Sequence, residues 1–169
     1  MDKRIYIVNG KPRSGKDTFY DILKTMVPTC KCSAVDKVKG IAELCGWNGG
    51  KTEKDRKFLS DLKILTADYS DMPFTDVMKK VCMFRNDSTY QVLLIDIREP
   101  EEIERAKVAF KAKTIFIVND RAPGVISNMA DANVEKYTYD YYIRNNGTLD
   151  EYKTNICTFA KIEGLDIKC

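Results

Sequence analysis

Seven residues near the start of the chain form a pattern that suits phosphate binding. The run Gly10-Lys11-Pro12-Arg13-Ser14-Gly15-Lys16 has two glycines separated by four residues and a lysine directly after the second. Glycines allow backbone amides to turn inwards around an anion, and a following helix adds its positive N-terminal end. This spacing is that of the P-loop, or Walker A motif, whose lysine reaches the β- and γ-phosphates of a nucleotide. The predicted nucleotide-binding residues of this loop are Gly10, Arg13, Ser14, Gly15 and Lys16.

Two aspartates are predicted to hold Mg²⁺ beside this loop. Asp17 follows Lys16, where a Ser or Thr hydroxyl is usual, and a carboxylate there can bind Mg²⁺ directly or through water. Asp96 ends the apolar run 92–95, a position at which P-loop proteins carry an acid for Mg²⁺. A strand that merely ends at an aspartate is the alternative. Thr18 is expected to cap the helix or touch the α-phosphate, and ATP and Mg²⁺ are the expected cofactors.

Arg98 follows Asp96 by two residues. Alternation along an extended chain would put both on one side at the carboxyl end of the sheet, where ligands of α/β proteins bind. A cation there could neutralise a phosphate of the acceptor. An ion pair with Glu99 or Glu102 at the start of a helix is the alternative.

Arg121 lies just after the apolar run 114–118. It is the natural candidate for an arginine on a lid that covers the γ-phosphate and excludes water, and a surface arginine is the alternative. The remainder of this segment, residues 122–136, has no further arginine, so the predicted lid is poor in basic residues.

The chain of 169 residues contains no histidine, which excludes a Ser-His-Asp triad, a Cys-His dyad and a His-ligated metal. Phosphoryl transfer needs aligned cations and carboxylates instead. The net charge of +3 is too small to indicate nucleic acid, although residues 1–85 carry an excess of basic residues. No stretch approaches the ~20 apolar residues of a membrane span. We expect a cytoplasmic protein with reduced cysteines and no membrane partner.

Apolar periodicity indicates elements that alternate between strand and helix. Near-continuous apolar runs at 5–8, 92–95 and 114–118 are typical of strands buried on both faces, with weaker strands expected at 32–35 and 140–143. The helical segments are 15–27, 53–68, 71–85, 99–111 and 148–161. This alternation predicts one α/β domain over residues 1–169, with a parallel sheet and a large helical insertion between its second and third strands in chain order.

Four stretches together resemble one family. The run IVNGKPRSGKDT resembles the G-x-x-x-S-G-K-D loop of phage-type deoxynucleoside monophosphate kinases, and the animal-type phosphomevalonate kinase has a similar loop. In both, aspartate after the lysine is normal. Residues 35–39 resemble the A-D-P-L-K segment of these enzymes, with Lys37 where proline is frequent. The run LLIDIREPEEIERAK and residues 140–147 resemble their D-x-R…E-I and D-x-x-I-x-N-x-G segments.

The resemblance covers residues 5 to about 160. It implies a P-loop NTPase fold of the nucleotide-kinase type, with a five-stranded parallel sheet, a nucleoside monophosphate (NMP)-binding insertion at about 36–88 and a short lid at about 120–137. Ser14, Gly15, Lys16, Asp17 and Thr18 would bind the donor nucleotide and its Mg²⁺. The residues expected to face the acceptor phosphate are Lys39, Arg56 and Arg98, and Asp36 could orient the acceptor or a metal-bound water.

The implied activity is ATP-dependent phosphoryl transfer to a nucleoside or deoxynucleoside monophosphate, giving the diphosphate. In this scheme Lys16, Arg98 and Arg121 are the catalytic residues. Two alternatives stay open: a kinase of another small phosphorylated metabolite such as phosphomevalonate, and a P-loop module that binds nucleotide without catalysis. The base and sugar that are accepted stay undetermined, and a homodimer stays an open alternative.

Overall fold

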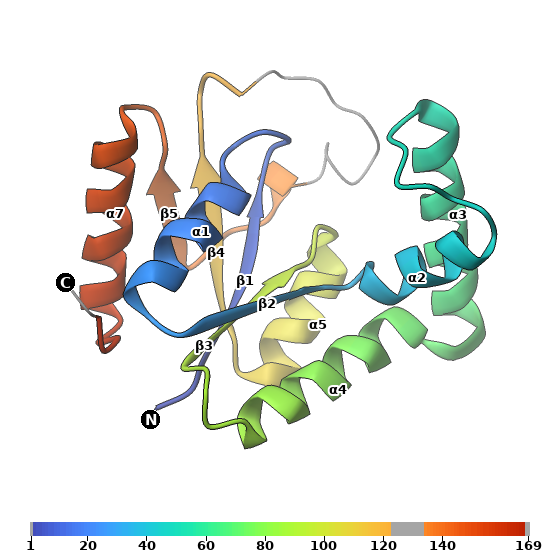
Figure 1. Ribbon diagram of the computed structural model, residues 1–169, viewed down its shortest axis with the longest axis horizontal. Coiled ribbons are helices and arrows are strands. Elements are labelled where there is room, and N and C mark those ends of the chain that lie inside the picture. The colour runs from blue at the N-terminus through green and yellow to red at the C-terminus, as the bar shows by residue number, and fades with distance from the viewer. Residues whose placement is uncertain (1, 123–133, 168–169) are drawn as a thin grey trace.

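A parallel β-sheet forms the centre of the computed structural model, which describes residues 2–122 and 134–167 (Figure 1). Within these residues five strands pair in the order β2-β3-β1-β4-β5. Their bounds are β1 Arg4–Gly10, β2 Thr29–Ser33, β3 Val92–Asp96, β4 Lys113–Val118 and β5 Tyr141–Arg144. Because β1 is the central strand, the loop that leaves its carboxyl end stands in the middle of that edge of the sheet.

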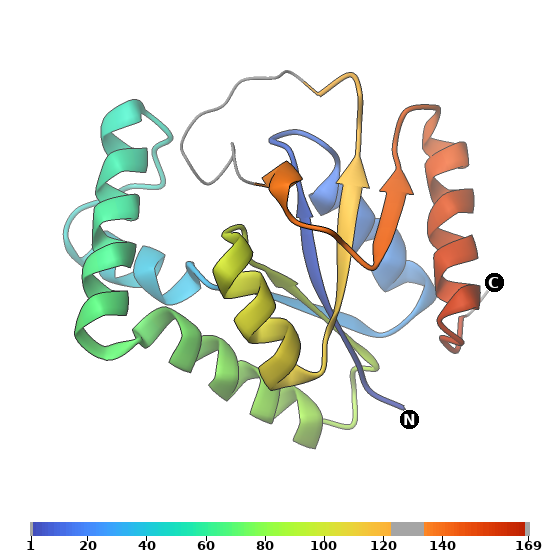
Figure 2. The ribbon, with the colours of Figure 1, turned by 180° about the vertical axis from the view of Figure 1, so that it is seen from behind.

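Helices cover both faces of the sheet. Two of them, α1 (Lys16–Met26) and α7 (Leu149–Ile162), pack on one face, and α4 (Met72–Asn86) and α5 (Pro100–Phe110) lie on the other (Figures 1 and 2). Each side has its own apolar core. Phe19 and Ile156 are fully buried on the α1–α7 side, as are Ile103 and Ala106 on the α4–α5 side. A short 3₁₀ helix, η1 (Val134–Lys136), precedes β5.

The local sequence accounts for most of these elements. The apolar runs that predicted buried strands are the interior of β1, β3 and β4, and their side chains are buried almost without interruption. Thr148 caps α7 through a reciprocal capping box with Glu151. Pro73 and Pro100 stand in the first turns of α4 and α5, where the missing amide hydrogen costs nothing. The predicted α/β architecture is therefore confirmed.

One strand prediction was wrong in position. The second strand covers Thr29–Ser33 and not 32–35, and its register pairs Ser33 with Asp96. This strand lies at the edge of the sheet and has two buried, two half-buried and one exposed side chain, so no continuous apolar run marks it. The residues that follow it turn directly into a helix, α2 (Asp36–Leu44), which periodicity had not identified.

Three helices separate β2 from β3 and account for the predicted insertion: α2, α3 (Glu53–Ser70) and α4. Whereas α4 packs on the sheet, α2 and α3 stand beside it (Figure 1). Not one residue of α3 is buried, although the helix has 18 residues. No helix in the described parts of the chain is long and apolar enough to cross a membrane.

Candidate active site

The phosphate loop connects β1 to α1 and depends on its two glycines. Gly10 and Gly15 have φ angles of +153° and +102°, a backbone conformation that residues with a side chain rarely adopt. A Cβ at Gly10 would lie 2.5 Å from Ser14 Oγ and 2.8 Å from the carbonyl oxygen of Ile117. At Gly15 it would lie 2.3 Å from Asn145 Nδ2. The tight packing of the loop therefore leaves room for glycine only.

Two side chains from the far end of the sequence hold the loop in place. Asn145 Nδ2 donates a hydrogen bond to the Ser14 carbonyl oxygen at 2.9 Å, and the Tyr152 hydroxyl donates to the Gly15 carbonyl oxygen at 3.1 Å. The backbone amide of Asn145 in turn donates a hydrogen bond to the Val118 carbonyl oxygen, at the end of β4. Neither residue was predicted to belong to the site, and the only signal was that Asn145 falls within the segment 140–147 of the family resemblance.

Lys16 lies across the loop that it follows. Its ammonium group donates hydrogen bonds to the carbonyl oxygens of Gly10, at 2.7 Å, and Lys11, at 3.0 Å. The buried Ser14 hydroxyl has no hydrogen-bond partner within the described residues. Such an unpaired group costs roughly 1–3 kcal/mol. Polar groups left in this way in a folded protein are characteristic of functional sites.

Opposite charges gather beside the first turn of α1. Asp17 Oδ1 is 2.6 Å from Lys31 Nζ, and this hydrogen bond holds the pKa of the Asp17 carboxyl below its ordinary value. Burial raises the pKa of the Asp96 carboxyl, against the opposing charges of Lys31 and Lys16, and the negative charge of Asp17 raises it further. Asp17 is therefore close enough to Asp96 to affect the ionisation of that carboxyl.

This pair of carboxylates fits a magnesium ion that is bound partly by the protein and partly by the phosphates of a nucleotide. Mg²⁺ prefers oxygen donors, keeps several waters and is commonly held by one or two carboxylates together with substrate phosphates. No cluster of three or more metal-ligating side chains occurs within residues 2–122 and 134–167. The described residues thus offer Asp17 and Asp96 as ligands, without a site made of protein groups alone.

The remaining residues predicted for the donor side occupy different surroundings. Arg13 is exposed, with a φ of +62°, and Thr18 is half-buried in the first turn of α1. Arg98 is exposed and lies two residues after Asp96. Its positive charge partly offsets the rise that burial causes in the pKa of the Asp96 carboxyl. The Arg98 carbonyl oxygen accepts a 3.3 Å hydrogen bond from the buried Asn9 side chain, which ties the end of β1 to the segment after β3.

Arg121 is exposed at the end of the described segment that follows β4. Its backbone amide donates to Asn119 Oδ1 at 3.0 Å. Hydrogen bonds from Thr148 hold the pKa of Glu151, at the start of α7, below its ordinary value, and the charge of Arg121 lowers it further. The predicted lid, 120–137, lies for the most part outside the described residues. In the described part of this range, Glu135 forms a 2.8 Å ion pair with Lys11 of the phosphate loop.

The residues predicted for the acceptor are less closely assembled. Asp36 Oδ2 accepts a hydrogen bond from the Ser33 amide at 2.8 Å and pairs with Lys80 at 3.0 Å, so this carboxylate connects α2 to α4. Lys39 and Arg56 are exposed on α2 and α3. Of these residues, Asp36 therefore makes contacts that join helices, whereas Lys39 and Arg56 face solvent.

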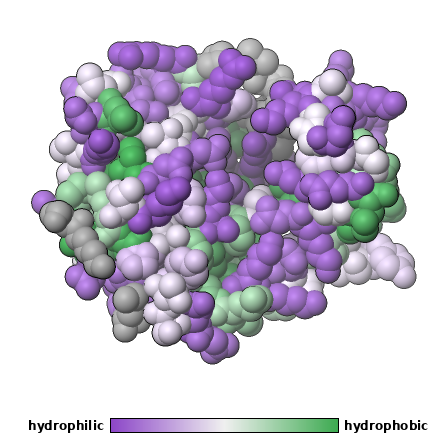
Figure 3. Space-filling model, viewed as in Figure 1, coloured by the Kyte–Doolittle hydropathy of each residue, from purple (hydrophilic) through white to green (hydrophobic). Residues whose placement is uncertain are grey.

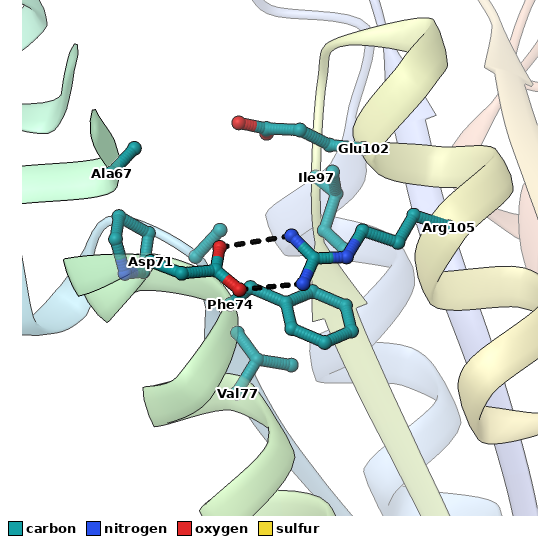
Figure 4. A pocket seen from close by; sticks show the side chains of 9 residues that line it. Ala67, Asp71, Phe74, Val77, Ile97, Glu102 and Arg105 are labelled. Carbon is teal, nitrogen blue, oxygen red and sulfur yellow. Dashed lines mark hydrogen bonds and ion pairs between the residues drawn. The ribbon is translucent and has the colours of Figure 1, made fainter. Parts of the chain in front are cut away.

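A small cavity, which the sequence did not predict, lies where the helical insertion meets α5 (Figure 4). Its lining is mainly apolar, and the charged groups at its rim include Arg105, whose guanidinium pairs with Asp71 through two contacts of 2.8 and 2.5 Å. Arg105 lies 3.6 Å from the centre of the Phe74 ring, and Phe110 stacks on the same ring at 5.4 Å. The residues lining the cavity are Ala34, Ala67, Asp71, Pro73, Phe74, Val77, Ile97, Glu102 and Arg105.

The surface between the loop and the helical insertion is hollowed. Figure 3 shows this hollow between the part of the molecule that carries α1 and the part that carries α3, and hydrophilic residues flank it. A shallow polar pocket between the phosphate loop and the end of β4 includes Lys11, Asn119, Asp120 and Glu135 in its lining. The phosphate loop therefore borders a polar surface on its β4 side.

Comparison with solved structures identifies the fold. The chain is similar to the tunicamycin resistance protein of Deinococcus radiodurans, with a TM-score of 0.61, 11% identity and 99% of each chain covered. It is also similar to TT1252 from Thermus thermophilus, with a TM-score of 0.57, 15% identity, and 96% of this chain and 98% of that one covered. Dephospho-CoA kinase from Campylobacter jejuni matches with a TM-score of 0.53, 17% identity, and 95% and 97% covered.

No protein-family model matches the chain, and no curated protein matches it either. The structural similarities, together with the loop that joins β1 to α1, show that the chain has the fold of P-loop kinases. The fold predicted from the sequence is thus confirmed.

Proposed function

We propose that this protein is an ATP-dependent phosphotransferase whose acceptor is a small phosphorylated molecule. Our first candidate is a nucleoside or deoxynucleoside monophosphate, which would be converted to the diphosphate. The observation that carries the proposal is the position of Lys16 across a glycine-dependent loop, with Asp17 and Asp96 beside it. A cation and two carboxylates in this arrangement suit a triphosphate and its metal ion better than any other ligand class.

The proposed chemistry needs positioning and charge rather than a strong base. The loop amides and the Lys16 ammonium would bind the donor phosphates, since both are donors at the positive end of α1. Arg98, near Asp96, would neutralise the acceptor phosphate, and Arg121 would approach from the β4 side. An acceptor phosphate oxygen is already ionised near neutral pH, so its attack on the γ-phosphorus requires no histidine.

Mg²⁺ would be held by Asp17 and Asp96, and it would supply positive charge to the donor phosphates. The protein's own part is to keep both carboxylates at the edge of the sheet. Asp96 ends β3, and Asp17 stands in the first turn of α1, which the core fixes through buried Phe19 and Leu23.

A second acceptor class is favoured by the cavity beside α5. Its apolar lining would suit an acceptor with a larger apolar part than a mononucleotide has, and Arg105 at its rim could pair with an anion. One structurally similar protein is a dephospho-CoA kinase, so this fold accommodates acceptors other than mononucleotides. The helices α2–α4 would then serve as the acceptor-binding insertion, and residues 120–137 as the lid.

The test is a coupled assay of ADP release with ATP, Mg²⁺ and a panel of acceptors. The panel contains the ribo- and deoxyribonucleoside monophosphates, dephospho-CoA and phosphomevalonate. We expect turnover with at least one of them, and a loss of about a thousandfold in the Lys16→Met variant, because an uncompensated phosphate charge would remain in the transition state. Lys24→Met, in the same helix but exposed and paired with Asp21, serves as the matched control and should retain turnover.

Three outcomes separate the candidate functions. Turnover with nucleotides supports the first acceptor class, and turnover restricted to the other acceptors supports the second. Tight ATP binding by calorimetry without turnover of any acceptor would refute phosphoryl transfer and favour a nucleotide-binding module. Unchanged turnover in Lys16→Met would show that the loop is not the donor site.

A further inference from the structure

Lys31 is a cation beside the candidate metal site that the proposed reaction does not use. It lies on β2, and its ammonium group contacts the Asp17 carboxylate at 2.6 Å. The register pairs Lys31 with Leu94 and Ser33 with Asp96. Because side chains two residues apart point to the same face of a sheet, Lys31 and Asp96 share the face that α1 covers. Lys31 therefore approaches both predicted metal ligands.

The charge of Lys31 acts on both carboxylates. Partial burial alone would lower the pKa of the Lys31 ammonium, but its hydrogen bond to the Asp17 carboxylate and the charge of Asp96 outweigh burial and raise that pKa. At Asp96, Lys31 is the strongest of the neighbouring positive charges, ahead of Lys16 and Arg98. Lys51 contributes only weakly at Asp17. Lys31 is thus the principal cation for the pair of acids.

The surroundings allow the Lys31 side chain to move away. The Asp17 side chain is 88% exposed, so its contact with Lys31 borders solvent. The Lys31 ammonium also lies 5.2 Å from the centre of the Tyr20 ring, whose face can hold a cation through its π electrons. An ammonium group displaced from Asp17 therefore has an aromatic ring close by as an alternative partner.

We propose that Lys31 takes the place of the divalent ion between Asp17 and Asp96 in the metal-free protein and competes with that ion for the two carboxylates. The identity of the ion rests on the proposed function. A lysine in this position offsets the repulsion between two neighbouring carboxylates when no metal is bound, because like charges held together without a counterion are unfavourable. It also weakens metal binding, since an ammonium and a divalent cation repel each other at the same carboxylate.

The competition can be measured directly with Mn²⁺ alone, followed by the electron paramagnetic resonance signal of the free ion. We expect Lys31→Gln to bind Mn²⁺ roughly two- to tenfold more tightly than the unmodified protein, the range that loss of a partly exposed ion pair and of one repulsive charge would produce. Lys31→Arg keeps the positive charge and should bind Mn²⁺ as weakly as the unmodified protein. Asp17→Asn should lose most of the Mn²⁺ binding.

Lys24→Gln is the matched control. Lys24 lies over the same Tyr20 ring, at 4.9 Å, and pairs with Asp21 instead of Asp17. Its replacement removes one positive charge from α1, near the same aromatic ring, and should leave Mn²⁺ affinity unchanged. Circular dichroism and thermal unfolding establish that all variants are folded.

Each outcome of the Mn²⁺ measurement either supports or refutes the proposed role of Lys31. Unchanged or weaker Mn²⁺ binding in Lys31→Gln would overturn the proposal, as would an equal gain in Lys24→Gln or the absence of saturable binding that depends on Asp17. Failure of the proposed function would appear separately, as absent turnover with every acceptor, and does not alter the Mn²⁺ measurement. Turnover with an unchanged Mn²⁺ affinity in Lys31→Gln would refute the role of Lys31 alone.

Discussion

The two sides of the hollow differ in how they are built. On the donor side, a single loop is fixed by glycine backbone angles and by hydrogen bonds from Asn145 and Tyr152. On the acceptor side, α3 buries none of its residues, and the predicted cations Lys39 and Arg56 are exposed on the helices that carry them. One side is constrained by the core of the sheet, whereas the other is attached to it through α4.

This difference indicates how the two sides would respond to change. Residues on the donor side are coupled to the fold, so a substitution there alters stability as well as binding. Exposed residues of α2 and α3 can be replaced with little effect on stability, because high exposure separates binding from folding. Under the proposed function, acceptor specificity would therefore change through exposed residues of the helical insertion while the phosphate loop is retained.

The largest expected effect is that of Gly15→Ala. The new methyl group would lie 2.3 Å from Asn145 Nδ2 at a φ of +102°, so backbone strain and a displaced hydrogen bond together should cost about 2–4 kcal/mol of unfolding free energy. Nucleotide affinity should fall with it. Denaturant unfolding and ATP calorimetry measure the two effects. Gly40→Ala is the control, because a Cβ at Gly40 meets nothing within 4 Å, and alanine in that helix should stabilise the protein slightly. Equal stability in both variants would contradict a rigid donor loop.

Asp96→Asn should have a smaller effect and the opposite sign. Burial raises the pKa of Asp96, so the folded state binds its proton more tightly than the unfolded chain does, and stability is lost as pH rises through this window. Asparagine removes the charge and should raise Tm at pH 7 by about 2–4 °C, the change that roughly 1 kcal/mol produces at this size. The gain should vanish near pH 4, where the aspartate of the unfolded chain also becomes protonated. A lower Tm at pH 7 would show that the site does not disfavour the ionised carboxylate.

The smallest effect on stability is expected at Arg56. Because its side chain is exposed, Arg56→Ala should change the unfolding free energy by less than about 0.5 kcal/mol, while the KM for the acceptor rises severalfold and kcat changes little. Lys57→Ala, one residue further and about 100° around the helix, is the matched control and should leave the KM unchanged. Thermal unfolding and acceptor titrations check both variants, and an equal KM in the two would remove Arg56 from the acceptor site.

Most of the donor side was predictable because its residues are neighbours in the chain. A loop that binds phosphate needs glycines, a lysine and a following helix at fixed spacing, and all of these stand between residues 10 and 18. The buried strands were predictable as well, since strands covered on both faces read as apolar runs. The edge strand β2 was displaced in the prediction, because only two of its five side chains are buried and Lys31 interrupts any apolar run.

The amino-acid sequence alone predicts the phosphate loop, the alternation of strands and helices, and an acid at the end of β3. The distant side chains that meet these elements are known only from the folded chain: Asn145 and Tyr152 at the loop, Lys31 at Asp17, and Arg105 at the cavity beside α5. The physical reason is that spacing and periodicity report local backbone geometry, while contacts between distant segments depend on strand order and register. That order places β3, and not β2, next to β1, and so brings Asp96 to the loop.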